Sequence, residues 1–288
     1  MNRITDLGRG IYRLTTEFDG GSVHTYAVMG EKLAVIDTGT ADTIDLIKEL
    51  YEKLGCPETE IVLHTHGHWD HIGAARQTKE LTGAPLGVHG DDAAMMGSRA
   101  ENDKRFLAAF PEDFEPTQPE IDVVEDNIGN QISPDVIVKP GDKFDLGGRT
   151  LAAVPIPGHT SGCLAFLDDL THTLFTGDGM CGIGSIGYLV QYEDVRGYLD
   201  SVERVRSLKP SCILCGHFDP FDTPEAIEKF LDECESEVRK VNESVKKLAP
   251  KYDDLNSLVR AVCADLGKPF ILQPFFTVTA HLEYIKRK

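Results

Sequence analysis

The sequence predicts an α/β fold with a helical C-terminal extension, and three observations lead to this prediction. Short stretches of β-forming residues open the chain between residues 11 and 38. Apolar residues at helical spacing follow at 43–54 and begin an alternation of helices with strands. A second β-rich run covers 135–178, and only helical patterns follow residue 224. The 288 residues suffice for one large domain or for two modest ones.

The first half combines a β meander with helices. Its predicted strands lie at 11–18, 24–30, 33–37, 61–63 and 86–89, and its predicted helices lie at 43–54, 74–81 and 93–110. Gly55 stands directly after the first of these helices, where a helix would stop. The strand at 61–63 delivers His64 at its carboxyl end, which is where α/β sheets build their sites.

Residues 91–134 differ from the segments around them. Beyond a helical start they are rich in Pro, Asp and Glu, and their periodicity is weak. We predict an insertion near the active site that forms a wall or lid and influences specificity. A homodimer contact is the alternative use of this segment and of the C-terminal helices.

The second half repeats the order of strands followed by helices. Its predicted strands lie at 135–138, 143–146, 150–156, 163–169, 172–178 and 213–214, and its predicted helices lie at 193–208, 224–248, 255–266 and 277–288. We expect these strands to form the second half of a β-rich layer. The strand at 213–214 leads directly to Gly216 and His217.

Charge and cysteine content restrict the partners and the compartment. The 29 basic and 47 acidic side chains give a formal net charge of -18, which disfavours nucleic acid and anionic membranes as partners. No stretch approaches the ~18 apolar residues of a membrane span, and the N-terminus lacks the pattern of a signal peptide. The seven scattered cysteines fit reduced thiols. We therefore expect a soluble, cytoplasmic protein.

The strongest motif is the octapeptide His64-Thr65-His66-Gly67-His68-Trp69-Asp70-His71. Imidazole nitrogens suit zinc and other first-row metals, and alternate residues of an extended turn can converge on one ion. Asp70 and His71 can then reach a second ion. A His-rich surface loop is the alternative interpretation of this segment.

This segment resembles the metallo-β-lactamase superfamily, whose signature is His-x-His-x-Asp-His. Counting back from Asp70 and His71 places the two signature histidines at His66 and His68. His64 lies two residues before this pair, so it is interpreted as a strand-end histidine or one that supports a ligand.

The resemblance covers roughly residues 10 to 220 and implies the remaining ligands. His159 lies in the turn 157–162, Asp178 ends the strand 174–178, and His217 follows 213–216, each in a setting similar to that of a family ligand. The implied metal ligands are His66, His68 and His159 at one ion, Asp70, His71 and His217 at the other, and Asp178 between them. The family also implies a four-layer αββα sandwich, with a catalytic domain at 1–222 and a helical extension at 223–288.

Two such cations would make the protein a hydrolase. They lower the pKa of a bridging water, which is ~15.7 in bulk, and they polarise the oxygen of the substrate. We predict this metal-bridging hydroxide as the nucleophile, with Asp70 as the catalytic residue that orients it. His68 stands where related diiron reductases carry Glu, which favours zinc. Iron or mixed metals are the alternative, as in relatives similar to glyoxalase II.

The predicted substrate is a small acyl compound such as a thioester, ester or lactone, as in glyoxalase II and the lactonases. The basic glutathione-contacting residues of glyoxalase II are not recognisable after Asp178, and the Tyr of the lactonases is replaced by Cys181. An RNA-cleaving or other phosphodiester-cleaving nuclease is an alternative that the net charge disfavours. A non-catalytic metal-binding protein is another. The N-terminus without an export pattern disfavours true β-lactamase activity.

Several further residues are weaker candidates for the site. Cys212 and Cys215 have the spacing of a redox or zinc pair, but no second pair accompanies them, so we interpret them as core thiols. Cys181 could line the pocket or fill the core. Tyr188, Tyr192 and His24 are pocket candidates whose alternative role is packing.

Overall fold

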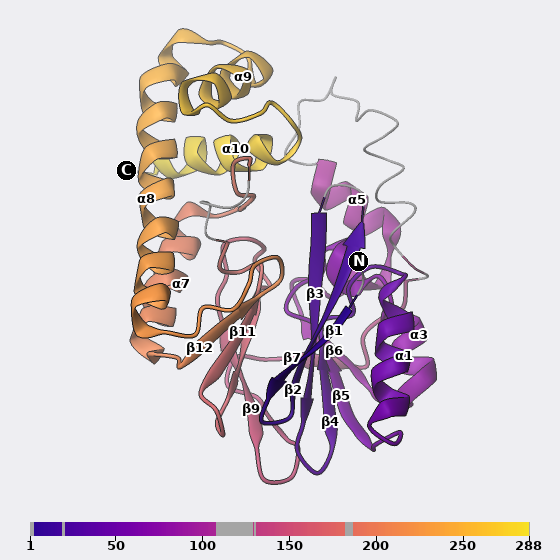
Figure 1. The fold of residues 1–288 in the computed structure, drawn as a ribbon. Coiled ribbons are helices and arrows are strands. Elements are labelled where there is room, and N and C mark those ends of the chain that lie inside the picture. Colours follow the sequence, from indigo (N-terminus) through magenta and orange to yellow (C-terminus); the bar gives the residue numbers. More distant parts are fainter. Residues whose placement is uncertain (1–2, 19–20, 108–128, 130, 182–186, 288) are drawn as a thin grey trace.

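The protein is a sandwich of two β-sheets with helices on both outer faces (Figure 1). The computed structural model describes residues 3–18, 21–107, 129, 131–181 and 187–287. Helices α1 and α3 cover one sheet, and α7 and α8 cover the other. This arrangement is the expected four-layer αββα sandwich.

The first sheet has seven strands in sequential order. They are β1 (Arg3–Gly8), β2 (Ile11–Phe18), β3 (Gly21–Met29), β4 (Leu33–Ile36), β5 (Thr59–Leu63), β6 (Leu86–His89) and β7 (Val136–Val138). The first four strands are antiparallel, and β4 to β7 pair in parallel. Strand β1 was not predicted from the sequence. The prediction that grouped the strand at 135–138 with the later strands was wrong, because β7 pairs with β6 of the first sheet.

The second sheet has five strands in the order β12-β11-β10-β9-β8. They are β8 (Lys143–Asp145), β9 (Thr150–Pro155), β10 (Leu164–Asp168), β11 (Thr173–Gly177) and β12 (Cys212–Cys215). Strand β12 joins β11 in parallel after the α7 crossover, so both strands present their carboxyl ends at the same edge of the sheet.

The helices follow the predicted periodicity closely. They are α1 (Thr43–Lys53), α2 (Trp69–Ile72), α3 (Ala75–Thr82), α4 (Ala93–Gly97), α5 (Arg99–Leu107), α7 (Val195–Leu208), α8 (Pro224–Leu248), the 3-10 turn η1 (Ala249–Lys251), α9 (Leu255–Leu266) and α10 (Gln273–Lys286). The single helix expected at 93–110 is two helices, because Ser98 is extended between them. Side-chain caps start α7, α8 and α9, where Asp194, Thr223 and Asp254 accept hydrogen bonds from backbone N–H groups.

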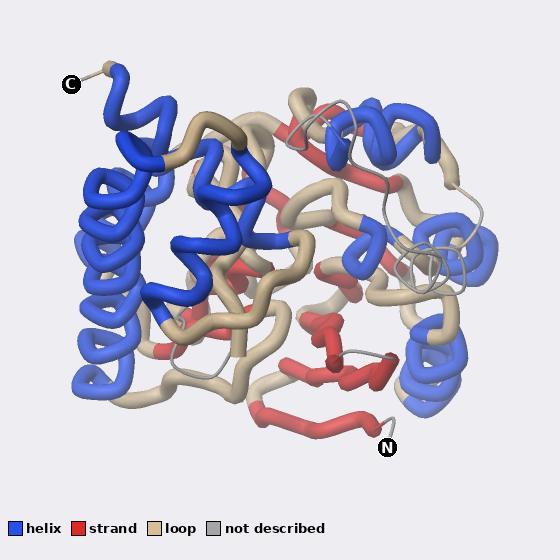
Figure 2. The backbone as a smooth tube through the Cα atoms, turned by 90° about the horizontal axis from the view of Figure 1, so that it is seen from above, coloured by secondary structure: helices blue, strands red, loops and turns tan. Residues whose placement is uncertain are grey.

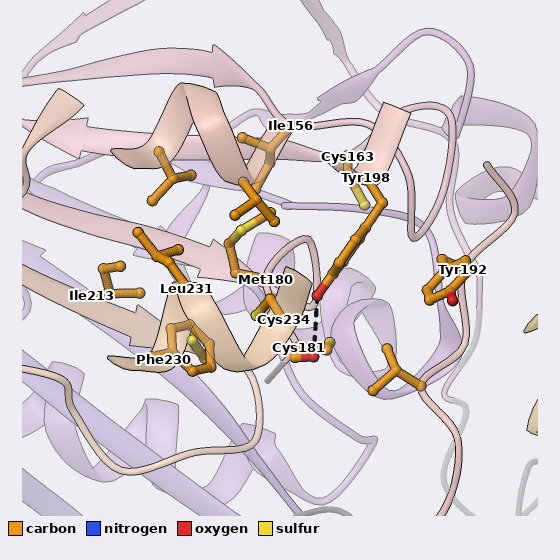
Figure 3. Close-up of a cluster of buried hydrophobic side chains, with 14 of the residues drawn as sticks. Ile156, Cys163, Met180, Cys181, Tyr192, Tyr198, Ile213, Phe230, Leu231 and Cys234 are labelled. Atoms are coloured by element: carbon orange, nitrogen blue, oxygen red, sulfur yellow. Dashed lines mark hydrogen bonds between the residues drawn. The ribbon is translucent and has the colours of Figure 1, made fainter. Parts of the chain in front are cut away.

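Three apolar clusters hold the four layers together. The middle cluster lies between the two sheets and includes Tyr26, Leu63, Phe166 and Phe175. A second cluster joins the first sheet to α1 and α3. The third, drawn in Figure 3, joins the second sheet to α7 and to the first half of α8. Each sheet is therefore buried on both faces, by the other sheet on one side and by helices on the other.

The C-terminal helices continue from this outer layer. The second half of α8 packs with α9 and α10 around a separate apolar cluster that includes Val245, Val259 and Phe275. Figure 2 shows these helices gathered on one side of the sandwich. The domain boundary at 222/223 stays a prediction, and α8 begins two residues after it.

The predicted insertion at 91–134 falls largely outside the described residues, since 108–128 and 130 are not described. Its described part contains α4 and α5. Among the helices that the structure describes, none is long and apolar enough to cross a membrane.

Candidate metal centre

The seven predicted ligands converge at one edge of the sandwich, although they come from distant parts of the chain. The loop after β5 and the short helix α2 carry the first four, and the turns after β9, β11 and β12 carry the other three. The residues brought together are His66, His68, Asp70, His71, His159, Asp178 and His217. Strand ends of both sheets therefore build a single cluster.

Three imidazoles form the first group. One nitrogen from each of His66, His68 and His159 lies within 4.8 Å of the other two. Nδ1 of His68 is 2.9 Å from Nε2 of His159. The ring of His66 is edge-on to both of the other rings. Three imidazoles at this spacing match the nitrogen donor set that zinc takes in catalytic sites.

Asp70, His71 and His217 form a second group with the same 4.8 Å limit. Oδ2 of Asp70 is 3.4 Å from Nε2 of His217 and 3.9 Å from Nε2 of His71. A carboxylate with two imidazoles is again a first-row metal donor set.

Asp178 lies between the two groups. Its Oδ2 is 3.1 Å from Nε2 of His217 and 3.8 Å from Nε2 of His159, while its Oδ1 is 3.4 Å from Nε2 of His71. The carboxylate therefore reaches both groups through one oxygen or the other.

The cluster fits cations because its inward-facing atoms lack other partners. Nε2 of His66, Nε2 of His71 and Oδ1 of Asp178 are buried and accept or donate no hydrogen bond among the described residues. Buried polar atoms are nearly always satisfied, so three unsatisfied atoms that face one another need an explanation. A cation held among them would satisfy all three atoms.

The charge state of the cluster also suits cations. Burial and the neighbouring imidazoles lower the pKa of His66 and His68 well below the usual value, which leaves both neutral, as a metal ligand must be. Burial opposes a charge on His217 too, but Asp178 and Asp70 raise its pKa to about 10. The two carboxylates thus attract positive charge to this part of the cluster.

Asp37 contacts the candidate ligand His71 and the start of the histidine loop, and it was not predicted from the sequence. Its buried carboxylate accepts hydrogen bonds from the backbone N–H and the hydroxyl of Thr65, at 2.7 and 2.9 Å, and from Nδ1 of His71 at 2.9 Å. This contact directs Nε2 of His71 into the cluster and fixes the start of the histidine loop. The only signal in the sequence is the strand-end position of Asp37.

Backbone carbonyls fix two further rings. Nδ1 of His159 donates to the carbonyl of Gln191 at 2.6 Å, and Nδ1 of His217 donates to the carbonyl of Ser22 at 2.6 Å. Each contact leaves Nε2 as the inward-facing nitrogen. No sequence pattern could reveal these partners, because any residue has a backbone carbonyl.

Gly216 allows the last ligand to approach the others. A Cβ atom at this position would lie 2.3 Å from Oδ1 of Asp178 and 2.7 Å from Cε1 of His71. Only glycine fits between these two side chains without displacing them.

The weaker candidates lie outside the cluster. His64 is buried, and its ring contacts Thr38 and the carbonyl of Gly87 rather than a ligand ring. The seven cysteines are free thiols. Cys215 and Cys181 are buried in the core, where Cys181 donates to the carbonyl of Asp178 at 2.7 Å and its own carbonyl accepts from Tyr198 (Figure 3). His24 is buried against Thr15.

The two tyrosines differ in their surroundings. Tyr188 is half-buried, and burial together with the charge of Asp178 raises its pKa. Tyr192 is buried, stacks on Tyr198, and its hydroxyl lies 2.6 Å from Nε2 of His281. It therefore does not face the metal cluster through its hydroxyl.

The αββα sandwich and the cluster of candidate ligands at its edge are the features of a metal-binding protein, and a comparison with known families identifies the family. Residues 18–217 match the family model of the metallo-beta-lactamase superfamily, so the chain belongs to that superfamily.

Relatives and a solved structure agree with this assignment. A beta-lactamase-like protein 2 homolog of Drosophila melanogaster is 28% identical over 68% of this chain and 58% of its own length. An acyl-coenzyme A thioesterase, MBLAC2 of Gallus gallus, is 26% identical over 75% of this chain and 80% of that protein. The hydroxyacylglutathione hydrolase GloC of Haemophilus influenzae is 32% identical over 50% of this chain and 59% of its own length. The fold is similar to that of a metallo-beta-lactamase family protein from Thermus thermophilus, with a TM-score of 0.76 and 21% sequence identity. The match covers 98% of this chain and 95% of that protein. The chain thus spans little more than half of two of these relatives.

Proposed function

We propose that the protein is a metal-dependent hydrolase that cleaves a small acyl compound, such as a thioester, an ester or a lactone. The observation that carries this proposal is the cluster of five imidazoles and two carboxylates, in which Nε2 of His66, Nε2 of His71 and Oδ1 of Asp178 are buried without a hydrogen-bond partner among the described residues. Such a donor set is costly to bury unless cations neutralise its carboxylates.

Each group of the cluster would hold one divalent ion. In this proposal His66, His68 and His159 bind the first ion, Asp70, His71 and His217 bind the second, and Asp178 contacts both. Five nitrogen donors favour zinc over magnesium or calcium, which prefer oxygen ligands.

The ions, when bound, would lower the pKa of a water molecule and polarise the acyl oxygen of the substrate. The protein's own residues would orient the water. Asp70 would accept a hydrogen bond from the attacking water, so that a lone pair of the water oxygen points at the acyl carbon. Asp37 holds the ring of His71 in place, since its carboxylate contacts Nδ1 of that ring.

Two observations support an acyl substrate. The relatives include an acyl-coenzyme A thioesterase and a hydroxyacylglutathione hydrolase, and both names describe the hydrolysis of an acyl compound. The net charge of -18 disfavours a polyanion such as RNA, because long-range repulsion would reduce its binding.

Hydrolysis assays on an acyl-coenzyme A thioester, a lactone and a phosphodiester test the proposal. We expect turnover of an acyl substrate that is lost on chelation and returns with zinc. His68→Asn should reduce kcat/KM by at least about 100-fold through loss of a ligand, whereas the control His172→Asn, whose ring contacts the carbonyl of Leu208, should leave it unchanged. Turnover of the phosphodiester alone, or of no substrate by the zinc-loaded protein, would refute the proposal.

A further inference from the structure

A short segment before α7 lies between the metal cluster and the C-terminal helix α10. This segment, residues 189–193, is called the strap below. Leu189, Val190 and Tyr192 of the strap are each at most 3% exposed. Its side chains pack into two different clusters, since Leu189 belongs to the C-terminal cluster and Val190 and Tyr192 belong to the cluster on the second sheet.

On its inner side the strap holds the His159 turn. The carbonyl of Gln191 accepts the hydrogen bond from Nδ1 of His159 at 2.6 Å. The backbone N–H of Glu193 donates to the carbonyl of Gly158 at 2.7 Å. The position of the His159 ring therefore depends on where the strap lies.

On its outer side the strap is held by two residues of α10. The hydroxyl of Thr277 donates to the carbonyl of Val190 at 2.5 Å, and the hydroxyl of Tyr192 lies 2.6 Å from Nε2 of His281. Thr277 and His281 are four residues apart, so they lie on one face of the helix. Both are fully buried. The two contacts flank Gln191, the residue that receives His159.

The protonation states of the outer pair are consistent with a fixed hydrogen bond. Burial raises the pKa of Tyr192 well above its usual value and lowers the pKa of His281 to about 3. Both groups are therefore neutral at physiological pH, and the hydrogen bond between the hydroxyl of Tyr192 and Nε2 of His281 needs no charge on either partner. Tyr192 also stacks on Tyr198 and lies among the labelled side chains of Figure 3.

We infer that α10 positions the metal ligand His159 through the strap, with Thr277 and His281 as its positioning residues. The inference rests on the proposed role of His159 as a ligand, and it assigns the C-terminal helix a part in metal binding that no ligand motif shows. Loss of the two outer hydrogen bonds lets the Gln191 carbonyl shift, so the His159 ring loses its fixed orientation. Supporting contacts of this kind typically change metal affinity by about 10- to 100-fold.

The test is a zinc titration of the full-length protein against a chromophoric chelator. The double variant Thr277→Val with Tyr192→Phe removes both hydroxyls and keeps the side-chain shapes. We expect one of the two zinc ions to bind roughly tenfold more weakly and the other to bind as before. Thr277→Ser, which keeps the hydroxyl, should bind zinc like the wild type.

Thr279→Val is the matched control. It makes the same substitution on the same helix, but the buried hydroxyl of Thr279 has no hydrogen-bond partner among the described residues. Its zinc affinities should equal those of the wild type. A loss in Thr279→Val equal to that in the double variant would assign the effect to general loosening of α10 and would overturn the inference.

A second measurement reads the hydrogen bond of His159 directly. In histidine-labelled, zinc-loaded protein, the Nδ1–H signal of His159 should be protected from solvent exchange in the wild type and should lose that protection in the double variant. Unchanged zinc affinity and unchanged protection in the double variant would overturn this inference alone. A wild type that binds no zinc would instead refute the proposed function.

Discussion

Asp37 shows how a single buried residue can organise a metal cluster without contacting an ion. Its carboxylate satisfies the backbone and hydroxyl of Thr65 and the Nδ1 of His71 at once. Ionised carboxylates accept such bonds strongly, and each contact aims a different part of the histidine loop. The residue therefore connects the first sheet to the site.

We predict that Asp37→Asn weakens zinc binding by about 10- to 100-fold. An amide can accept through only one oxygen, and its NH2 group would face donors. Chelator competition measures the affinity, and Asp253→Asn, at an exposed position before α9, is the control. Zinc affinity equal to that of the control would contradict this role of Asp37.

Gly216 leads to a second prediction at a single residue. In Gly216→Ala the new methyl group would lie 2.3 Å from Oδ1 of Asp178, so the carboxylate must move away from the imidazoles. We expect hydrolysis to fall by at least about 100-fold, since small displacements of reacting groups have effects of this size. Gly90→Ala is the matched control, because its methyl group meets only Cγ2 of Ile137 at 3.4 Å. Near-normal kcat/KM in Gly216→Ala would show that the site tolerates the shift.

Between elements, one buried ion pair joins the two sheets. Arg149, in the turn before β9, forms two hydrogen bonds with Asp168 of β10, at 3.0 and 2.6 Å. Its remaining nitrogen donates to the carbonyl of Arg9, in the turn between β1 and β2, and to the carbonyl of Met29 at the end of β3. Both charged side chains are almost fully buried. The pair thus fixes the end of the sandwich away from the helical extension.

We expect Asp168→Asn to lower the free energy of unfolding by about 3 to 5 kcal/mol at neutral pH, because Arg149 would keep a buried charge without its partner. Burial alone would raise the pKa of Asp168, but hydrogen bonds from Arg149 and Thr171 lower it. A carboxylate with a lowered pKa stabilises the fold above its unfolded pKa of ~3.9, and this contribution is lost as the pH falls toward the folded pKa.

Urea unfolding at several pH values checks this prediction. The difference between wild type and Asp168→Asn should be constant from pH 7 to about 5 and should shrink below about pH 4. Asp169→Asn, at the exposed neighbouring position, should cost much less. A difference below about 1 kcal/mol at pH 7 would place the pair among weak surface contacts.

Local patterns predicted most elements, and the exceptions have physical reasons. The strand β1 was missed because Arg3–Gly8 is an exposed edge strand without a buried alternate face. Strand β7 belongs to the first sheet because it pairs with β6, and an apolar run of three residues does not indicate its pairing partner. The seven candidate ligands could be named from the sequence because they lie in short motifs, whereas Asp37 and Gln191 contact two of them across 34 and 32 residues of chain.

At the scale of the whole molecule, the metal cluster joins segments from both halves of the chain. Residues from the loop after β5 meet residues that follow β9, β11 and β12, so ions bound there would link the two sheets. Ligands that bind only the folded state stabilise it by mass action. Metal binding and global stability are therefore expected to be coupled.

We predict that zinc removal lowers the melting temperature by at least roughly 10 °C. At free zinc about 1,000-fold above the dissociation constant, one site contributes about 4 kcal/mol, and each kcal/mol shifts the melting temperature of a domain of this size by about 2 to 4 °C. Calorimetry of the zinc-loaded and chelated protein measures the shift. An unchanged melting temperature would show that the cluster does not bind zinc selectively in the folded state.

The most direct test of the account is the metal content of the purified protein after zinc loading and dialysis, measured by mass spectrometry for the wild type and for Asp178→Asn. Asp178 reaches both groups of the cluster, so its loss should affect both ions. We predict close to two zinc ions per chain in the wild type and clearly fewer in the variant. A wild type without zinc, or a variant with an unchanged zinc content, would contradict the assignment of these seven residues to a two-metal site.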